Sequence, residues 1–438
     1  MDFSNSPGAQ CSAVPAGGMQ KSNPTVNRDS WSSVINSWNP FAVGGAEGGF
    51  FHIKWFQTLT DPHFLRWILL FSYYSLTSES VTRKEQQDHM FKFTLFALDK
   101  MKEVLKELKI EEYCGINCGG ALHFHYSDIP IKKSKNPSLS IEPVSRINSN
   151  DLLAMESCVS NWPKSISYAD FETESCAGNC ELFTRHIADI AKWELGVNFL
   201  MNTEVKLFDI EKYTSSTAKN SMSTIKTIHT TKGIIDIDDN TEVIIAAGSW
   251  TPKLLWLCGY FAPIYPMKGY SVSVDLPQVG SNTRPKETDI PSRMLIDQKM
   301  YISRVGEQVR ITSMGEFCGW DTKPDPKIDS MFRDKGRIRI PALQPLFDAT
   351  PTRCGLRPYS ADGIIILGRI KTTTNLSVNV GPGFNGWKIS IGAADVLANT
   401  LVGSDSGQDY FDSTLLSPSQ RIVSSPLWCL ISRIRWSC

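Results

Sequence analysis

The chain has 438 residues, of which 41% are hydrophobic and 21% charged, so it is a globular protein long enough for two domains. Lysine plus arginine and aspartate plus glutamate number 45 each, and the resulting zero net charge does not favour a nucleic-acid partner. The most apolar stretch, residues 64–76, is too short to span a bilayer and contains Arg66, so we expect a buried or interfacial helix and no transmembrane segment.

Eleven cysteines are spread along the chain and no secretory signal opens it, which predicts reduced thiols in an intracellular protein, cytoplasmic or mitochondrial. Two cysteine pairs have wider spacing than zinc sites normally use, and one histidine pair has no third ligand in view. No metal site is therefore expected, and the histidines should be solvated or hydrogen-bonded. The groups concerned are Cys114 with Cys118, Cys176 with Cys180, and His123 with His125.

The first half of the chain predicts a loop of small residues, two helices and a strand. Paired glycines in residues 12–20 would let the backbone approach a flat ligand, although a flexible tail is the alternative. One helix should begin at Asp61, and a second should run from about Lys84 to Lys109, where apolar residues recur at i, i+3 and i+4. Residues 119–126 alternate like a strand.

The second half alternates helices with strands and then changes character. A helix is expected at 181–194, then a glycine and a short strand at 203–205, and a hairpin at 224–237. The apolar run 242–248 predicts a strand buried on both faces, and the carboxyl ends of such strands are where α/β sheets bind ligands. Short alternating runs within 263–350 predict an antiparallel sheet.

A glycine turn lies late in the chain, between a strand at 376–380 and a helical stretch that runs to 401. The turn, 381–386, reads G-x-G-x-x-G, which is typical of dinucleotide sites. Free N–H groups and partial positive charge at a helix N-terminus favour an electron-rich ligand. No second strand or acidic ribose ligand can follow so late, so this ligand need not be a pyrophosphate; glycines that serve packing are the alternative.

Four motifs occur in a fixed order with sensible gaps, at 11–20, 242–255, 355–368 and 379–401. Together they resemble the FAD-dependent amine oxidoreductases of the D-amino acid oxidase family. Within this family, the chain looks most similar to the small subunits of D-amino acid dehydrogenases, and the glycine oxidases are more distantly similar. The resemblance covers roughly residues 9–403, and the combination of motifs is specific although no single motif is.

The resemblance implies an α/β chain with two domains. One is a Rossmann-like, three-layer FAD-binding domain assembled from separate segments, and the other is an α+β substrate domain whose antiparallel sheet covers the flavin. The expected boundaries are 1–50, 170–262 and 351–403 for the FAD-binding domain, 51–169 and 263–350 for the substrate domain, and 404–438 for a C-terminal tail.

The resemblance also implies the site. Arg357 would bind the substrate carboxylate, which a guanidinium fork suits, and Tyr301 would place its hydroxyl near the same carboxylate. An interface salt bridge for Arg357 and an ordinary strand aromatic for Tyr301 are the alternatives, and Cys354 is not expected to bind flavin covalently. The implied cofactor contacts are Ala16, Gly17, Gly18, Met19 and Gln20 along the isoalloxazine ring, Val205 at the adenine, Ala247 and Gly248 at the nucleotide, and Gly383, Phe384, Asn385, Gly386 and Trp387 at the flavin pyrimidine edge.

The implied activity is oxidative deamination of D-amino acids to 2-oxo acids and ammonia, a step of amino acid catabolism. The substrate Cα would give a hydride to flavin N5, and oxygen, a quinone or another flavoprotein would then take the electrons. An oxidase of glycine-like or sarcosine-like amines is the alternative activity.

One departure from the family pattern matters. Family members begin with a strand, a G-x-G-x-x-G turn, a helix and a second strand with an acidic ribose ligand. Roughly 35 residues of that kind are missing here, about one βαβ unit. Either the sequence is a fragment of a working flavoenzyme, or the chain is a non-catalytic remnant that cannot hold FAD; the intact catalytic-looking loops favour the first.

Overall fold

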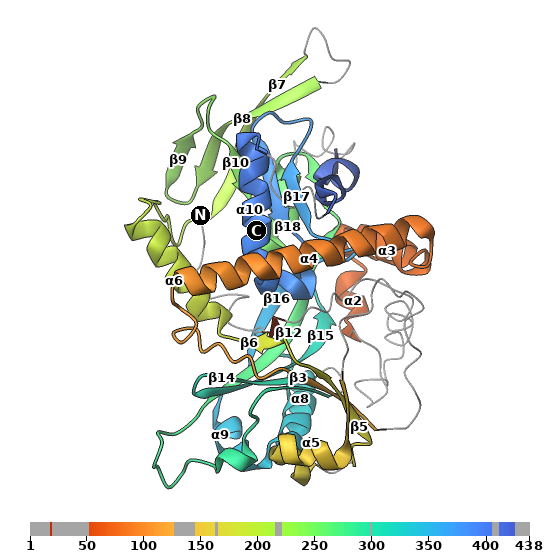
Figure 1. Ribbon diagram of the computed structural model, residues 1–438. Coiled ribbons are helices and arrows are strands. Elements are labelled where there is room, and N and C mark those ends of the chain that lie inside the picture. Colours follow the sequence, from red (N-terminus) through yellow and green to blue (C-terminus); the bar gives the residue numbers. More distant parts are fainter. Residues whose placement is uncertain are drawn as a thin grey trace.

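Two sheet regions, joined by long helices, make up the protein (Figure 1). In Figure 1 the larger sheet lies below and a smaller set of sheets lies above, and helices α3 (Pro62–Leu76) and α4 (Val81–Glu107) cross between them. The computed structural model describes residues 18–19, 52–126, 145–162, 165–214, 221–297, 300–404 and 411–424.

The larger sheet has nine strands and is mainly antiparallel, which confirms the sheet predicted within 263–350. Its order is β16-β12-β15-β14-β13-β3-β5-β4, with β2 paired to β15. The strands are β16 (Arg353–Ser360), β12 (Ile264–Asp275), β15 (Gln308–Phe317), β14 (Met300–Val305), β13 (Met294–Asp297), β3 (Ala121–His125), β5 (Tyr168–Glu172), β4 (Ser145–Asn148) and β2 (His52–Ile53).

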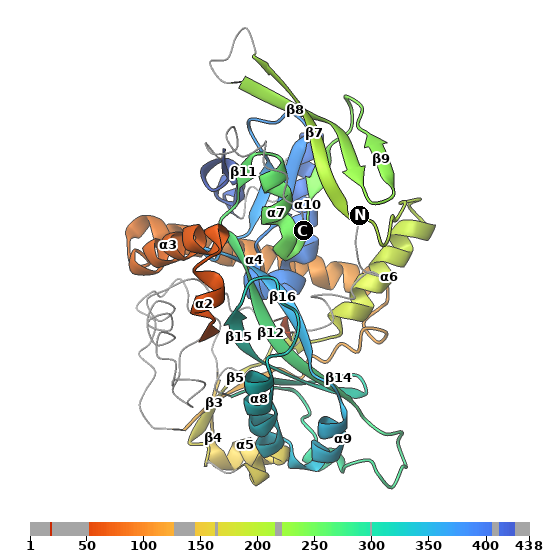
Figure 2. The same cartoon turned by 180° about the vertical axis from the view of Figure 1, so that it is seen from behind.

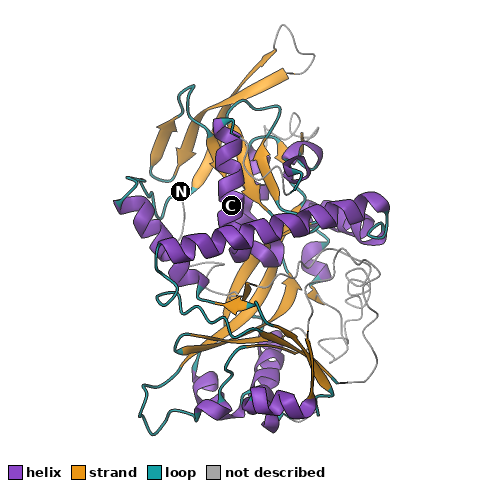
Figure 3. Ribbon diagram, in the orientation of Figure 1, coloured by secondary structure: helices purple, strands orange, loops and turns teal. Residues whose placement is uncertain are grey.

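The two faces of this sheet differ because its strands alternate apolar and polar residues. One face packs helices α5 (Ser149–Met155), α8 (Pro326–Arg339) and α9 (Gln344–Ala349), which lie beneath the sheet in Figure 3. Side chains such as Tyr270 and Ile311 fill this core. The opposite face is turned toward the upper region. It carries most of the sheet's polar side chains, such as Thr312, Ser271 and Arg353, around a small apolar cluster that includes Ile296, and we call it the polar face.

The upper region contains a three-stranded sheet in the order β10-β18-β17 and a three-stranded antiparallel meander, β7-β8-β9 (Figure 2). Helix α10 packs on β17 and β18, and α7 packs against β10 and β7. The elements are β10 (Val243–Ile245), β18 (Leu376–Val380), β17 (Ile366–Arg369), β7 (Val205–Thr214), β8 (Ser221–Thr230), β9 (Gly233–Asp236), α6 (Cys180–Trp193), α7 (Thr251–Leu257) and α10 (Gly386–Val402), with short pairs β1 (Gly18–Met19) to β6 (Cys176–Ala177) and β11 (Tyr260–Phe261) to β19 (Val423–Ser424).

The helices follow their predicted starts and stripes. Asp61 caps α3, since its side chain accepts a hydrogen bond from the His63 N–H. Helix α4 crosses α10 so closely that a Cβ on Gly392 would lie 2.5 Å from the Ala97 Cβ. The short helix α2 (Trp55–Thr58) precedes them. No helix in the described part of the chain is long and apolar enough to cross a membrane.

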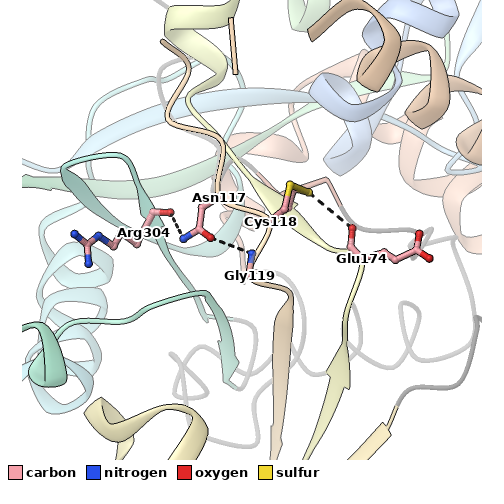
Figure 4. The surroundings of a disulfide bond; sticks show 6 residues. Asn117, Cys118, Gly119, Glu174 and Arg304 are labelled. Atoms are coloured by element: carbon pink, nitrogen blue, oxygen red, sulfur yellow. Dashed lines mark hydrogen bonds between the residues drawn. A yellow bond between two sulfur atoms is a disulfide. The ribbon is translucent and has the colours of Figure 1, made fainter. Parts of the chain in front are cut away.

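The prediction of reduced thiols is wrong for one pair, because Cys118 and Cys176 form a disulfide (Figure 4). The bond takes one cysteine from each C-x3-C pair. The two segments lie side by side because Asn117 and Ala177 exchange backbone hydrogen bonds of 2.8 Å in both directions. Spacing within each pair carries no information about this pairing, since the segments are 58 residues apart.

Candidate functional site

The predicted substrate residues lie on the polar face of the large sheet. Tyr301 on β14 is opposite Thr312, which is opposite Ser271, which is opposite Arg353 on β16. Opposed residues share a face, and residues i and i+4 on one strand do as well. Arg357 therefore points to the same face as Tyr301.

A glycine brings these two side chains together. Gly269 on β12 lies beneath the guanidinium of Arg357, and a Cβ at this position would be 2.4 Å from the Arg357 Cζ. The bare strand thus gives the long side chain room to lie across the sheet toward β14. Burial raises the pKa of the Tyr301 hydroxyl, and the positive charge of Arg357 acts in the opposite direction. The two groups are therefore close enough to interact electrostatically.

The glycine turn covers the guanidinium from the other side. The ring of Phe384, in the short 3₁₀ helix Gly383–Asn385 that precedes α10, has its centroid 5.4 Å from the Arg357 Cζ. The same ring lies 5.4 Å from that of Tyr359, two residues after Arg357 on β16. The two motifs that sequence separates by over 20 residues therefore build one site, with Arg357 between Gly269 and Phe384.

The N-terminus of α10 adds exposed backbone donors to this site. Gly383 has φ +56, which favours glycine, and its Cα lies against the Tyr359 ring, so the turn is held tightly on β16. The Asn385 side chain makes no capping hydrogen bond at this helix start, so within the described part of the chain the N–H groups of the first turn, from Gly386 on, could face an anion or an electron-rich ring.

Trp387 and the short strand β1 lie together beside this helix start. Met19 and Trp387 pack in one cluster, and a Cβ on Gly178 would be 2.6 Å from the Trp387 ring. The Trp387 Nε1 is buried and has no hydrogen-bond partner among the described residues. Gly18 pairs with Ala177 in this strand, whereas Ala16, Gly17 and Gln20 lie outside the described residues.

Of the three residues predicted to contact the nucleotide, one lies next to the candidate site and two lie farther away. Gly248 has φ +53 and opens a 3₁₀ turn whose Ser249 hydroxyl donates a 3.0 Å hydrogen bond to the Leu356 carbonyl, so it borders the Arg357 strand. Ala247 and Val205 pack farther out, against the core of the upper region. The structure therefore brings Gly248 to the candidate site and leaves Val205 at the foot of the β7-β8-β9 meander.

The hydrogen-bond donors at this site could bind the ring system of a flavin. For the diphosphate of FAD, the described residues offer no second glycine-rich turn. The uncapped start of α10 and the unpartnered Trp387 Nε1 are donors that a heteroaromatic edge could use, and Gly178 leaves no side chain in the way. The Gly381–Gly386 turn is the one glycine-rich strand-to-helix turn of this pattern within the described ranges. The residues present thus fit the ring end of FAD.

Comparison with known proteins identifies the class. The family model described as FAD dependent oxidoreductase matches residues 43–400, and the chain belongs to this family. This confirms the predicted family, its α/β fold with a large sheet, and the FAD-dependent oxidoreductase class.

Individual proteins of the family share 30% or less of their residues with this chain in the examples that follow. D-amino acid dehydrogenase of Agrobacterium fabrum is 30% identical over 244 residues, which cover 54% of this chain and 51% of the relative. The chain thus spans about half the length of the curated relatives it matches. Glycine oxidase from Geobacillus kaustophilus has a TM-score of 0.58 at 18% identity over 75% of this chain and 82% of its own, and iminodiacetate oxidase from Chelativorans has a TM-score of 0.55 at 15% identity over 92% and 89%.

Sequence reasoning missed three parts of the site. Gly269 stands within the run YPMKGYSV, which alternates like any strand, so only the guanidinium of Arg357 packed over it in the fold shows why it lacks a side chain. The contact between Phe384 and Arg357 also depends on tertiary packing. The third part is a buried lysine at the start of α10, Lys388, which lies within an apolar helical pattern.

Gly269→Ala is expected to displace the guanidinium without unfolding the sheet. The added methyl group would lie within 2.5 Å of the Arg357 guanidinium atoms, so that group must move, and a shift of about 1 Å at a binding group can cost on the order of a hundredfold in rate. Steady-state kinetics should show a fall in kcat/KM of about ten- to a hundredfold. The same substitution made on an Arg357→Ala background should have little further effect; full additivity would contradict the contact.

Proposed function

We propose that the chain carries out FAD-dependent oxidative deamination of D-amino acids to 2-oxo acids and ammonia. The observation that carries this proposal is the pairing of Arg357 with Tyr301 on the polar face, beside the uncapped start of α10. A guanidinium fork and a hydroxyl on one side of a site suit a carboxylate. The names of the D-amino acid dehydrogenase relatives and the glycine oxidase neighbours support this substrate class.

In this proposal the sheet forms the substrate-binding side and the upper region holds the cofactor. The corresponding domains are 51–169 with 263–350 for substrate, and 1–50, 170–262 and 351–403 for FAD, followed by the tail 404–438. Gly18, Met19, Gly248 and residues 383–387 would hold FAD in the described part of the chain. When bound, FAD accepts the hydride that the substrate Cα releases.

The side chains of this chain then orient the substrate. Arg357 holds the carboxylate, so that the Cα–H bond of only one enantiomer can point toward the start of α10. Tyr301 donates a hydrogen bond from its hydroxyl to the same carboxylate, since burial keeps the phenol protonated by raising its pKa. The helix N-terminus stabilises negative charge that develops beside it.

An anaerobic substrate panel tests the proposal. The purified chain, supplied with FAD, should bleach the flavin spectrum with D-amino acids and release a 2-oxo acid and ammonia, and L-enantiomers should be slow. Faster turnover of glycine or sarcosine would favour the amine oxidase alternative. A colourless chain that does not take up added FAD would favour the non-catalytic alternative and contradict the proposal. Turnover with oxygen, a quinone and a flavoprotein would identify the electron acceptor.

A further inference from the structure

A lysine is buried where positive charge is unfavourable. Lys388 lies in the first turn of α10 and is 5% exposed. Cations are disfavoured at a helix N-terminus, because the backbone N–H groups there already carry partial positive charge. Burial lowers the pKa of Lys388 to about 7, against an opposing effect of the Glu172 carboxylate. The amine can therefore gain or lose a proton near neutral pH.

Glu172 connects this lysine to the surface of the molecule. It ends strand β5 and is 7% exposed, and its Oε2 lies 3.5 Å from the Nε2 of His123 on the adjacent strand β3. The side chain of His123 is 35% exposed. The Glu172 carboxylate acts electrostatically on Lys388 on one side and lies next to the part-exposed His123 on the other, so the three proton-carrying groups lead from a buried amine toward solvent. We call these three groups the relay cluster.

The two strand members of the relay cluster, Glu172 and His123, lie on the same sheet face as the substrate residues. His123 is opposite Ile296 on β13, and Ile296 is opposite Tyr301 on β14. Two strand spacings, or about 10 Å, therefore separate the backbones of His123 and Tyr301, and both side chains leave the same face. Lys388 reaches the same site from the other side, since it lies only four residues after Phe384, whose ring centroid is 5.4 Å from the Arg357 Cζ.

We propose that the relay cluster carries away the proton that the amino group of the substrate must lose before it is oxidised. This inference rests on the proposed function and names residues that deepen it. An N–H bond of the substrate ammonium breaks, and the proton moves to the neutral amine of Lys388 while the nitrogen keeps the electron pair. Lys388 passes the proton to the Glu172 carboxylate, and Glu172 passes it to the free ring nitrogen of His123 and so to water. Each relay group returns to its starting state, so no oxidant or reductant is consumed.

Protein stability tests the buried lysine without any turnover. In the unfolded chain Lys388 has an ordinary pKa near 10.5, so between about pH 7 and 10.5 only the unfolded state binds this proton. Unfolding therefore takes up a proton, and stability rises with pH through this window. Lys388→Met should be more stable than the parent at pH 7, and the difference in Tm should shrink toward pH 10. Lys92→Met is the control, because this lysine is 47% exposed on α4 and pairs with Asp88, so its replacement should leave the pH dependence of stability unchanged. A Tm difference for Lys388→Met that does not change with pH would overturn the proposal.

Kinetics test the proton path itself. For D-amino acid oxidation, Lys388→Met should lower kcat/KM at pH 7 about a hundredfold and recover at alkaline pH, where the substrate amine loses its proton to solvent. Glu172→Gln and His123→Gln should shift the pH profile in the same direction, and His123 is exposed enough to be replaced without loss of the fold. Added imidazole should partly rescue His123→Gln. A parent enzyme that is active, with unchanged pH profiles in all three variants, would overturn the relay; a folded, FAD-loaded parent that oxidises no amino acid would overturn the proposed function instead.

Discussion

Arg357→Ala is expected to raise KM for D-amino acids by at least about thirtyfold, with kcat less affected. Loss of one partner of a desolvated charge pair costs about 2–5 kcal/mol, and 2 kcal/mol corresponds to roughly thirtyfold in affinity. The guanidinium is held between Gly269 and Phe384, so its position depends on the shape of this site as well as on its charge. Arg357→Lys should recover only part of the loss, because an ammonium group lacks the planar fork that binds a carboxylate through two parallel hydrogen bonds. Steady-state kinetics with a carboxylate inhibitor as second probe measure both effects.

The same strand offers a matched control. Arg353 lies four residues before Arg357 on the same face of β16, but its guanidinium is exposed and 3.6 Å from Glu181. Exposed ion pairs contribute little, so Arg353→Ala should leave KM within about twofold of the parent value. Equal losses in the two variants would show a general effect of charge on this face and contradict a specific carboxylate site at Arg357.

Local patterns predicted the elements of this fold well where a single face is buried. The apolar stripe of α4 and the cap at Asp61 depend on neighbouring residues only, and the structure has both helices close to their expected positions. The alternation within 263–350 predicted the antiparallel sheet for the same reason. The motif order then predicted that the Arg357 strand and the glycine turn belong to one site, and the contact of Phe384 with Arg357 agrees with it.

Local patterns could not predict whether a strand lies in the middle of its sheet or at its edge. The run 242–248 suggested a strand buried on both faces, and this was wrong, because Ile244 is 46% exposed and β10 ends its sheet. Apolar residues at 195–200 are also exposed, and the short strand expected at 203–205 begins only at Val205. An entirely apolar strand is predicted to be buried on both faces. Whether other elements actually pack on both faces depends on residues that are far away in the sequence.

Buried charges were the other feature that patterns could not show. Lys388 follows Trp387 in a helix whose stripe is otherwise apolar, and the carboxylate that acts on it, Glu172, lies over 200 residues earlier on β5. The disulfide between Cys118 and Cys176 likewise joins segments that pair only in the fold. The resemblance therefore proposed Arg357 through a motif, whereas the side chains placed around it are defined by the tertiary packing.

The largest effect on stability is expected at the centre of the sheet, at Glu316. Its carboxylate lies 3.0 Å from the Lys268 ammonium, and both side chains are fully buried. The Tyr270 hydroxyl donates a 2.7 Å hydrogen bond to the same carboxylate, and Lys54 lies 3.1 Å from its other oxygen. Glu316→Gln keeps the shape of the side chain but leaves Lys268 in the interior without its closest counter-charge. Removal of one partner of a buried pair typically costs about 3–5 kcal/mol, so urea unfolding at pH 7 should show a loss of that size.

Two further variants show whether the charge pair, rather than shape, carries this effect. The double change Lys268→Met with Glu316→Leu removes both charges together, and it should recover most of the stability because no uncompensated ion stays buried. Glu287→Gln is the matched surface control: Glu287 is exposed and pairs with Arg284 and Arg304, so its replacement should cost at most about 1 kcal/mol. Arg357 is opposite Met267, the residue before Lys268, and successive residues on a strand point to opposite faces. Glu316→Gln should therefore lower stability while KM stays close to the parent value. A rise in KM equal to that of Arg357→Ala would contradict this separation of the two sheet faces.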